Sequence, residues 1–156
     1  MIRREDDGFW VELEERIHIH HEEVFGCLTS AGGLTRWMCL SGEVDLREGG
    51  TITFGWNEKM TRTTTLAILE YDPGGRITWD WYAGPEDRHA PITWTVDVDE
   101  TPGEEATVVR MRQGPYDADV DCLVRMAEEV DAWRWRLCNL RTVLESKHDM
   151  RRHRPL

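Results

Sequence analysis

The sequence predicts an α+β fold in which a curved antiparallel sheet of six to seven strands wraps around one long C-terminal helix. Residues 119–146 carry apolar side chains in steps of three and four, which places them on one stripe of a single helix of about 25 residues. Before this helix, residues 9–113 alternate apolar and polar side chains in short runs separated by turn residues, as antiparallel strands do. An apolar stripe must be buried, so we expect the sheet to grip the helix and to leave room for a ligand between them. The stripe consists of Leu123, Met126, Val130, Trp133, Leu137, Leu140 and Leu144.

The first predicted strand spans residues 9–19, and two short helices follow it. Along the strand, Val11, Leu13 and Ile17 share one face, while charged residues share the other. HHEEVFGCLTS then reads as a short helix, AGG as a break, and LTRWM as a second helical turn. The remaining strands are predicted at residues 43–46, 51–56, 61–71, 76–82, 92–98 and 106–113, and residues 114–119 as a loop whose aspartates can cap the long helix.

Composition limits the classes of function. The chain has 156 residues, which corresponds to one domain over residues 1–156, with an ordered core expected at about 8–147. Its net charge of −11 argues against nucleic acid and anionic membranes as partners. No run approaches 18 apolar residues, and no apolar segment follows the first charged residues, so we expect no membrane insertion and a cytoplasmic location. The four cysteines lack metal-binding spacing and are expected to be reduced.

An unusual number of tryptophans is expected to face the space beneath the helix. The chain has eight tryptophans and only three phenylalanines. Several share the apolar face of their strands, so their rings either line a ligand pocket or fill it. Two polar residues, Glu15 and Arg62, alternate in step with the apolar residues of their strands and so are expected to face inward. They are candidates to orient the polar end of a ligand. The candidate ligand-binding residues are therefore Trp37, Phe54, Trp56, Trp79, Trp81, Trp94, Met126, Val130, Trp133, Arg62 and Glu15.

Other candidate clusters are weaker. His18 and His20 form an HxH pair, but they share the solvent-facing parity and have no third ligand nearby, so we expect no metal site. Arg110 and Arg112 are expected to face solvent and to pair with acidic neighbours across the sheet. His89 would be the first acid–base candidate if the protein were an enzyme. No phosphate loop, dinucleotide fingerprint, nucleophile elbow or HExxH motif is present, so no cofactor is expected and the catalytic residues, if any, are unknown.

Several motifs resemble those of one protein superfamily. They are EEVFGCLTSAGGLTRWM after the first strand, DLREGGTITF, LEYDPGGRITWDW at a hairpin, and AWRWRLCNLRTVLE in the last helix. In this order they resemble the SRPBCC superfamily (START-like, Bet v 1-like or helix-grip), in the branch related to the C-terminal domain of the activator of the 90-kDa heat-shock-protein ATPase. The resemblance implies the helix-grip fold and a hydrophobic cavity, but no particular reaction.

Three functions stay open. The favoured one is the binding of a small apolar or amphipathic ligand, such as a lipid, between the sheet and the long helix. The second is an enzyme of the polyketide cyclase or aromatase type, which would need several polar groups inside the same cavity. The third is a co-chaperone-like interaction module, which would need an exposed apolar patch. A homodimer and a chaperone partner are both compatible with the sequence.

Overall fold

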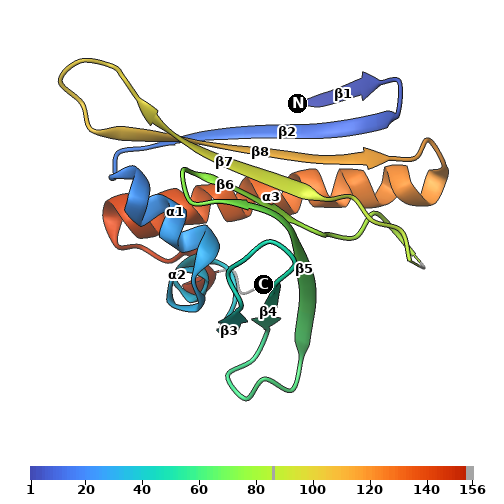
Figure 1. Cartoon of the computed structure of the whole chain (residues 1–156), viewed down its shortest axis with the longest axis horizontal. Coiled ribbons are helices and arrows are strands. Elements are labelled where there is room, and N and C mark those ends of the chain that lie inside the picture. Colours follow the sequence, from blue (N-terminus) through green and yellow to red (C-terminus); the bar gives the residue numbers. More distant parts are fainter. Residues whose placement is uncertain (86, 154–156) are drawn as a thin grey trace.

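The computed structural model, which describes residues 1–85 and 87–153, shows one curved antiparallel sheet with the long helix α3 lying along it (Figure 1). The described strands follow the order β1-β2-β8-β7-β6-β5-β4-β3. Helices α1 and α2 pack together near one end of α3 (Figure 1). The elements are β1 (Ile2–Glu5), β2 (Gly8–Ile17), α1 (His21–Thr29), α2 (Ala31–Trp37), β3 (Ser41–Val44), β4 (Thr51–Gly55), β5 (Thr63–Asp72), β6 (Arg76–Trp79), β7 (Ile92–Asp99), β8 (Ala106–Tyr116), α3 (Val120–Ser146) and the 3-10 helix η1 (Met150–Arg152).

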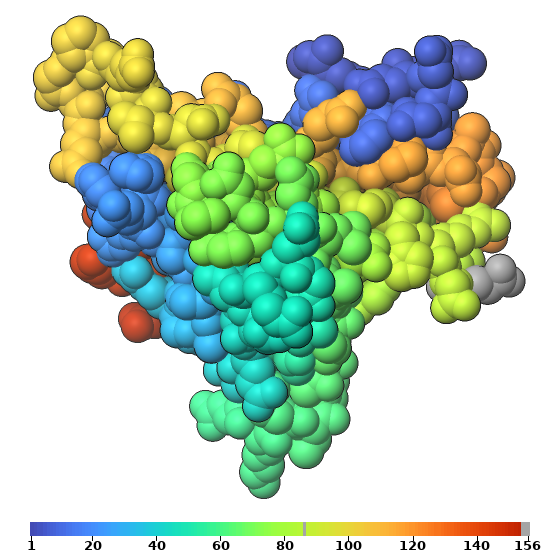
Figure 2. Space-filling model, viewed as in Figure 1, coloured from blue at the N-terminus to red at the C-terminus, as the bar shows by residue number. Residues whose placement is uncertain are grey.

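The predicted α+β architecture is confirmed, although the sheet has eight described strands where six to seven were expected. The additional strand is β1, which pairs with β2 so that Ile2 lies opposite Val11. All four residues of β1 are exposed and most are charged, so no apolar alternation marks it in the sequence. Both β1 and η1 lie outside residues 8–147, where the ordered core was expected. The hairpins β4–β5 and β7–β8 project from the body of the molecule (Figure 2).

One predicted loop is part of a strand. Residues 114–116 were expected to belong to the loop before the long helix. In the structure β8 continues to Tyr116, which pairs with Phe9 and is fully buried. In contrast, β6 ends at Trp79, three residues earlier than expected.

The glycines between the two short helices begin a helix where a break was expected. The Ser30 hydroxyl accepts a hydrogen bond from the Gly33 backbone N–H at 3.0 Å and so caps α2. A Cβ atom at Gly33 would lie 2.1 Å from the Gly26 carbonyl oxygen, so only glycine lets α2 approach α1 this closely. Close packing therefore outweighs the low helix propensity of this segment.

The long helix begins and ends close to its predicted limits. The Asp119 side chain caps it by accepting a hydrogen bond from the Cys122 backbone N–H at 3.0 Å. Five stripe residues are buried, while Leu123 and Val130 are half-buried against the core. Asn139 is also buried and joins α3 to α2 by donating to the Trp37 carbonyl at 2.8 Å. None of the helices described combines the length and apolar character needed to cross a membrane.

Candidate ligand-binding site

The space between the sheet and α3 is centred on a cluster of aromatic rings. Trp133 on α3 contacts three sheet-side rings, with centroid distances of 6.4 Å to Trp79, 5.2 Å to Trp81 and 5.5 Å to Trp94. Many of these contacts are edge-to-face or tilted, which is the arrangement that aromatic quadrupoles favour. The rings therefore fill the centre of the space. The aromatic cluster consists of Trp37, Phe54, Trp56, Trp79, Trp81, Trp94 and Trp133.

A pocket of about 360 Å³ opens beside the aromatic cluster. Trp56 stacks on Phe54 with a centroid distance of 5.9 Å, so the cluster forms one wall of this pocket. The volume lies within the range of small-molecule sites, roughly 300–1,000 Å³. The pocket is unusual in containing three arginines, and we call it the arginine pocket. Its lining residues are Met38, Cys39, Leu40, Trp56, Arg62, Arg136 and Arg151.

The three arginines of this pocket differ in how their charges are satisfied. Arg151 pairs with Asp149 at 2.8 Å and donates to the backbone carbonyls of Thr35 and Cys39, so it is a structural residue. Arg62 is exposed, and its guanidinium makes no ion pair with any residue that the structure describes. Among the arginines of this pocket, Arg136 therefore stands out as partly buried and without an ion pair to any residue in the described part of the chain.

Arg136 lies over the Trp133 ring, with its guanidinium carbon 4.6 Å from the ring centroid. Its Nε atom is buried and has no hydrogen-bond partner in the described structure. Burial lowers the pKa of Arg136, whereas the Glu129 carboxylate acts in the opposite direction. An anion bound in the pocket would stabilise the Arg136 guanidinium, because it would compensate the positive charge and accept a hydrogen bond from the unpaired N–H of the described structure.

The structure brings most of the predicted ligand residues together. The seven predicted aromatic residues form the cluster, and Arg62 joins Trp56 at the arginine pocket. Met126 is buried and Val130 packs against the core, both on the inner side of α3. Glu15 lies elsewhere, because its carboxylate pairs with Arg134 at 3.4 Å and Arg141 at 3.0 Å.

Two charged residues on α3 escaped the sequence analysis. Glu129 is only 5% exposed, and its Oε2 atom has no hydrogen-bond partner in the described structure. Its Oε1 atom pairs with Arg125 at 2.9 Å. Glu129 and Arg136 are four residues before and three residues after Trp133, so both occupy the apolar stripe. This periodicity was the signal that could have identified them.

The histidines and the outer arginines have local partners. His18 lies 2.9 Å from Glu145, and His20 caps α1 by accepting from the Glu22 backbone N–H at 3.3 Å. His89 is exposed and lies 3.0 Å from Asp80. As expected, Arg110 and Arg112 pair with acidic residues on the outer face of the sheet, namely Glu14, Asp97, Glu5 and Glu12.

A larger hollow of about 910 Å³ lies over β2, β7 and β8. Its wall includes Arg110, Arg112 and Arg134, each of which already pairs with a carboxylate. A charged ligand would have to compete with these internal partners. The hollow is therefore a weaker candidate for an anion than the arginine pocket.

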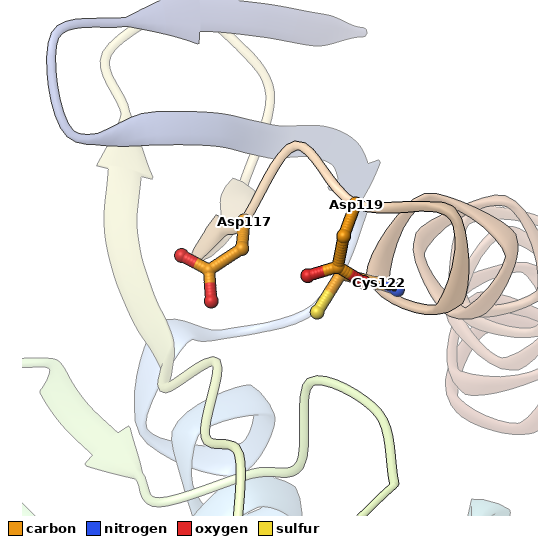
Figure 3. A group of neighbouring side chains, drawn as sticks. All are labelled: Asp117, Asp119 and Cys122. Atoms are coloured by element: carbon orange, nitrogen blue, oxygen red, sulfur yellow. Dashed lines mark hydrogen bonds between the residues drawn. The ribbon is translucent and has the colours of Figure 1, made fainter.

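Three possible metal ligands meet at the start of α3, where Asp117, Asp119 and Cys122 lie close together (Figure 3). The guanidinium of Arg88 contacts two of them, at 2.5 Å from Asp119 Oδ2 and 3.1 Å from Cys122 Sγ. The other oxygen of Asp119 caps the helix. A cationic side chain thus already compensates this acidic group, and the geometry does not call for a metal ion.

Comparison with known proteins identifies the family. Residues 18–145 match the family described as "Activator of Hsp90 ATPase homolog 1-like protein". No curated protein sequence matches this chain.

The fold is shared with solved structures of low sequence identity. A protein from Staphylococcus saprophyticus is 20% identical, with a TM-score of 0.73 over 91% of this chain and 96% of its own. The Aha1 dimer from Colwellia psychrerythraea is 20% identical, with a TM-score of 0.69 over 88% of this chain and 96% of its own. An Hsp90 activator from Plasmodium falciparum is 19% identical, with a TM-score of 0.66 over 86% of this chain and 95% of its own. The family match covers most of the sequence, and the chain therefore belongs to the Activator of Hsp90 ATPase homolog 1-like protein family.

Proposed function

We propose that the protein binds a small amphipathic molecule with an anionic group and a flat apolar body in the arginine pocket. The observation that carries this proposal is Arg136, whose buried Nε has no hydrogen-bond partner among the residues described and whose guanidinium lies on Trp133 beside an open pocket. The anionic group would pair with Arg136 and Arg62. The apolar body would lie against Trp56 and the edge of the aromatic cluster.

The pocket favours this class of ligand over a purely apolar one. An apolar molecule would leave the Arg136 charge without a partner in a partly buried site, which is unfavourable. A cationic molecule would be repelled by Arg62 and Arg136. A planar carboxylate instead matches the fork of N–H donors that a guanidinium presents.

The test uses 2-naphthoate as the probe and isothermal titration calorimetry as the measurement. Replacing Arg136 by Gln removes the charge, and we expect it to weaken binding by about tenfold or more, the value of a charge-assisted hydrogen bond of roughly 1.5–3 kcal/mol. Arg134→Gln is the matched control, because Arg134 is on the same helix but pairs with Glu15. The amine 2-naphthylmethylamine has a similar body with opposite charge and should not bind.

Binding should also change tryptophan fluorescence, since Trp56 lines the pocket. The proposal fails if 2-naphthoate does not bind, or if Arg136→Gln and Arg134→Gln bind it equally well. In the latter case neither arginine contributes to binding, and the ligand occupies another site.

A protein partner is the competing proposal. The relatives include one described as an Aha1 dimer and one described as an Hsp90 activator. The filled centre of the sheet–helix space also favours an interaction module over a large-ligand carrier. Stimulation of a 90-kDa heat-shock-protein ATPase, together with no binding of the probe, would support this alternative. Light scattering over a range of concentrations would show whether the chain forms a homodimer.

A further inference from the structure

Unpaired polar atoms extend from the arginine pocket toward the other end of α3. Beyond Trp133, the Glu129 carboxylate has a free oxygen and the Tyr116 hydroxyl has no hydrogen-bond partner, considering all residues that the structure describes. Glu129 is 5% exposed and Tyr116 is fully buried. The indole N–H groups of Trp81 and Trp133 are also buried and have no hydrogen-bond partner within the described ranges. Buried polar groups are normally hydrogen-bonded, so this concentration needs an explanation.

Glu129 and Tyr116 belong to one local group. Burial raises the pKa of the Tyr116 phenol, and the nearby Glu129 carboxylate raises it further. Arg125 pairs with only one of the two Glu129 oxygens, at 2.9 Å. The group therefore combines a carboxylate oxygen that can accept a hydrogen bond with a hydroxyl that can accept or donate one.

Glu129 and Arg136 mark two positions along α3. They are seven residues apart, so their backbone atoms are separated by about 10 Å along the helix axis. Trp133 lies between them and carries the Arg136 guanidinium on its ring. Trp133 is fully buried and does not line the arginine pocket, so a flat molecule reaches both ends only if the Trp133 ring is displaced.

We propose that Glu129 and Tyr116 form a second polar subsite, and that the preferred ligand carries a hydroxyl or amine at the opposite end of its apolar body from its anionic group. This inference rests on the proposed function, since the arginine pocket holds the anionic end. The donor of the ligand would bind Glu129 Oε2, the carboxylate oxygen that Arg125 leaves free. To reach it, the ligand must separate the rings of Trp81 and Trp133, which now meet at a centroid distance of 5.2 Å.

Three naphthoates distinguish this subsite from the arginine pocket. The probe 6-hydroxy-2-naphthoate has a hydroxyl across the ring system from its carboxylate, 2-naphthoate lacks it, and 6-methoxy-2-naphthoate keeps an oxygen that cannot donate. We expect the hydroxyl compound to bind about tenfold tighter than the other two, as a hydrogen bond to a buried carboxylate allows. Its binding should also change tryptophan emission more strongly, because the rings of Trp81 and Trp133 must part.

Variants of the subsite should remove this preference without removing the binding of 2-naphthoate. Glu129→Gln replaces the charged acceptor by a neutral one and should reduce the advantage of the hydroxyl compound to about threefold or less. Tyr116→Phe should reduce it partly. Glu128→Gln is the matched control, because Glu128 is exposed on the same helix and its loss should leave the preference unchanged. Thermal melting of each variant checks that it is folded.

The outcomes separate the two proposals. If 2-naphthoate binds through Arg136 but the hydroxyl and methoxy compounds bind equally to the unmodified protein, the subsite is overturned and the arginine pocket stands. Such a result would mean that internal water alone satisfies Glu129 and Tyr116. If the hydroxyl preference persists in Glu129→Gln, another residue provides the acceptor, and the assignment to Glu129 is wrong. If no naphthoate binds, the proposed function fails and this inference fails with it.

Discussion

The apolar stripe of α3 should carry a large share of the stability, and Leu140 tests this directly. Leu140 is fully buried in the hydrophobic core. Replacing it by Ala removes buried methyl and methylene groups and leaves a cavity, for which measured losses are about 2–5 kcal/mol. For a domain of this length each kcal/mol corresponds to roughly 2–4 °C in melting temperature, so we expect a decrease of about 4–20 °C.

The measurement is urea unfolding followed by tryptophan fluorescence, combined with thermal melting. Val124→Ala is the matched control, because Val124 is on the same helix with 53% of its surface exposed. This control should change the stability by less than about 0.5 kcal/mol, as most surface substitutions do. A loss below about 1 kcal/mol for Leu140→Ala would refute the reasoning, since it would mean that the stripe packs against a loose or solvated partner.

Three further predictions concern charged and ionisable groups. Hydrogen bonds from Arg16 and then Thr101 lower the pKa of Asp99 to about 2. The Asp99 carboxylate therefore stabilises the fold above its unfolded-state pKa, and this stabilisation is lost as the pH falls from about 4 to 2. Asp99→Asn should flatten the acid-unfolding curve between these pH values, and an unchanged curve would contradict this. Burial raises the pKa of the Cys39 thiol to about 11. Iodoacetamide at pH 8 should therefore modify the half-buried Cys138 before Cys39, as peptide mass spectrometry would show. Equal rates of modification at the two cysteines would contradict this prediction. Because Arg88 already compensates Asp119 and Cys122, EDTA should leave the melting temperature unchanged, whereas a decrease reversed by zinc would reveal a metal site.

The fold was predictable because its main signals are local and periodic. The stripe of α3 and the inward rows of the strands each repeat with the period of their own secondary structure. The parts that were missed lack such a signal. Strand β1 is held by pairing with β2 and by no apolar face, and the α2 glycines are selected by their contact with α1, a tertiary effect.

The candidate site was only partly predictable. The alternation of the strands placed their aromatic residues on the inner face, because alternate side chains point to the same side of a sheet, and the helical stripe placed Trp133 opposite them. The alternation of side chains along a strand does not determine whether seven large rings line a space or fill it, since that depends on their rotamers and on the curvature of the sheet. Strand alternation also could not show that two arginines on α3 reach the Glu15 carboxylate and pair with it.

Charged residues on the inner side of α3 conflict with its role in the core, and such conflicts often mark functional sites. If Arg136 serves a ligand and not the fold, Arg136→Leu should separate stability from function. The substitution removes a buried unpaired Nε, whose burial costs roughly 1–3 kcal/mol, and loses a contact with Trp133 of roughly 0.5–2 kcal/mol. These values nearly cancel, so the melting temperature should stay the same or rise while 2-naphthoate binding falls by about tenfold or more. A decrease of several degrees in the melting temperature would instead show that Arg136 is a structural residue, and the arginine pocket would lose its main support.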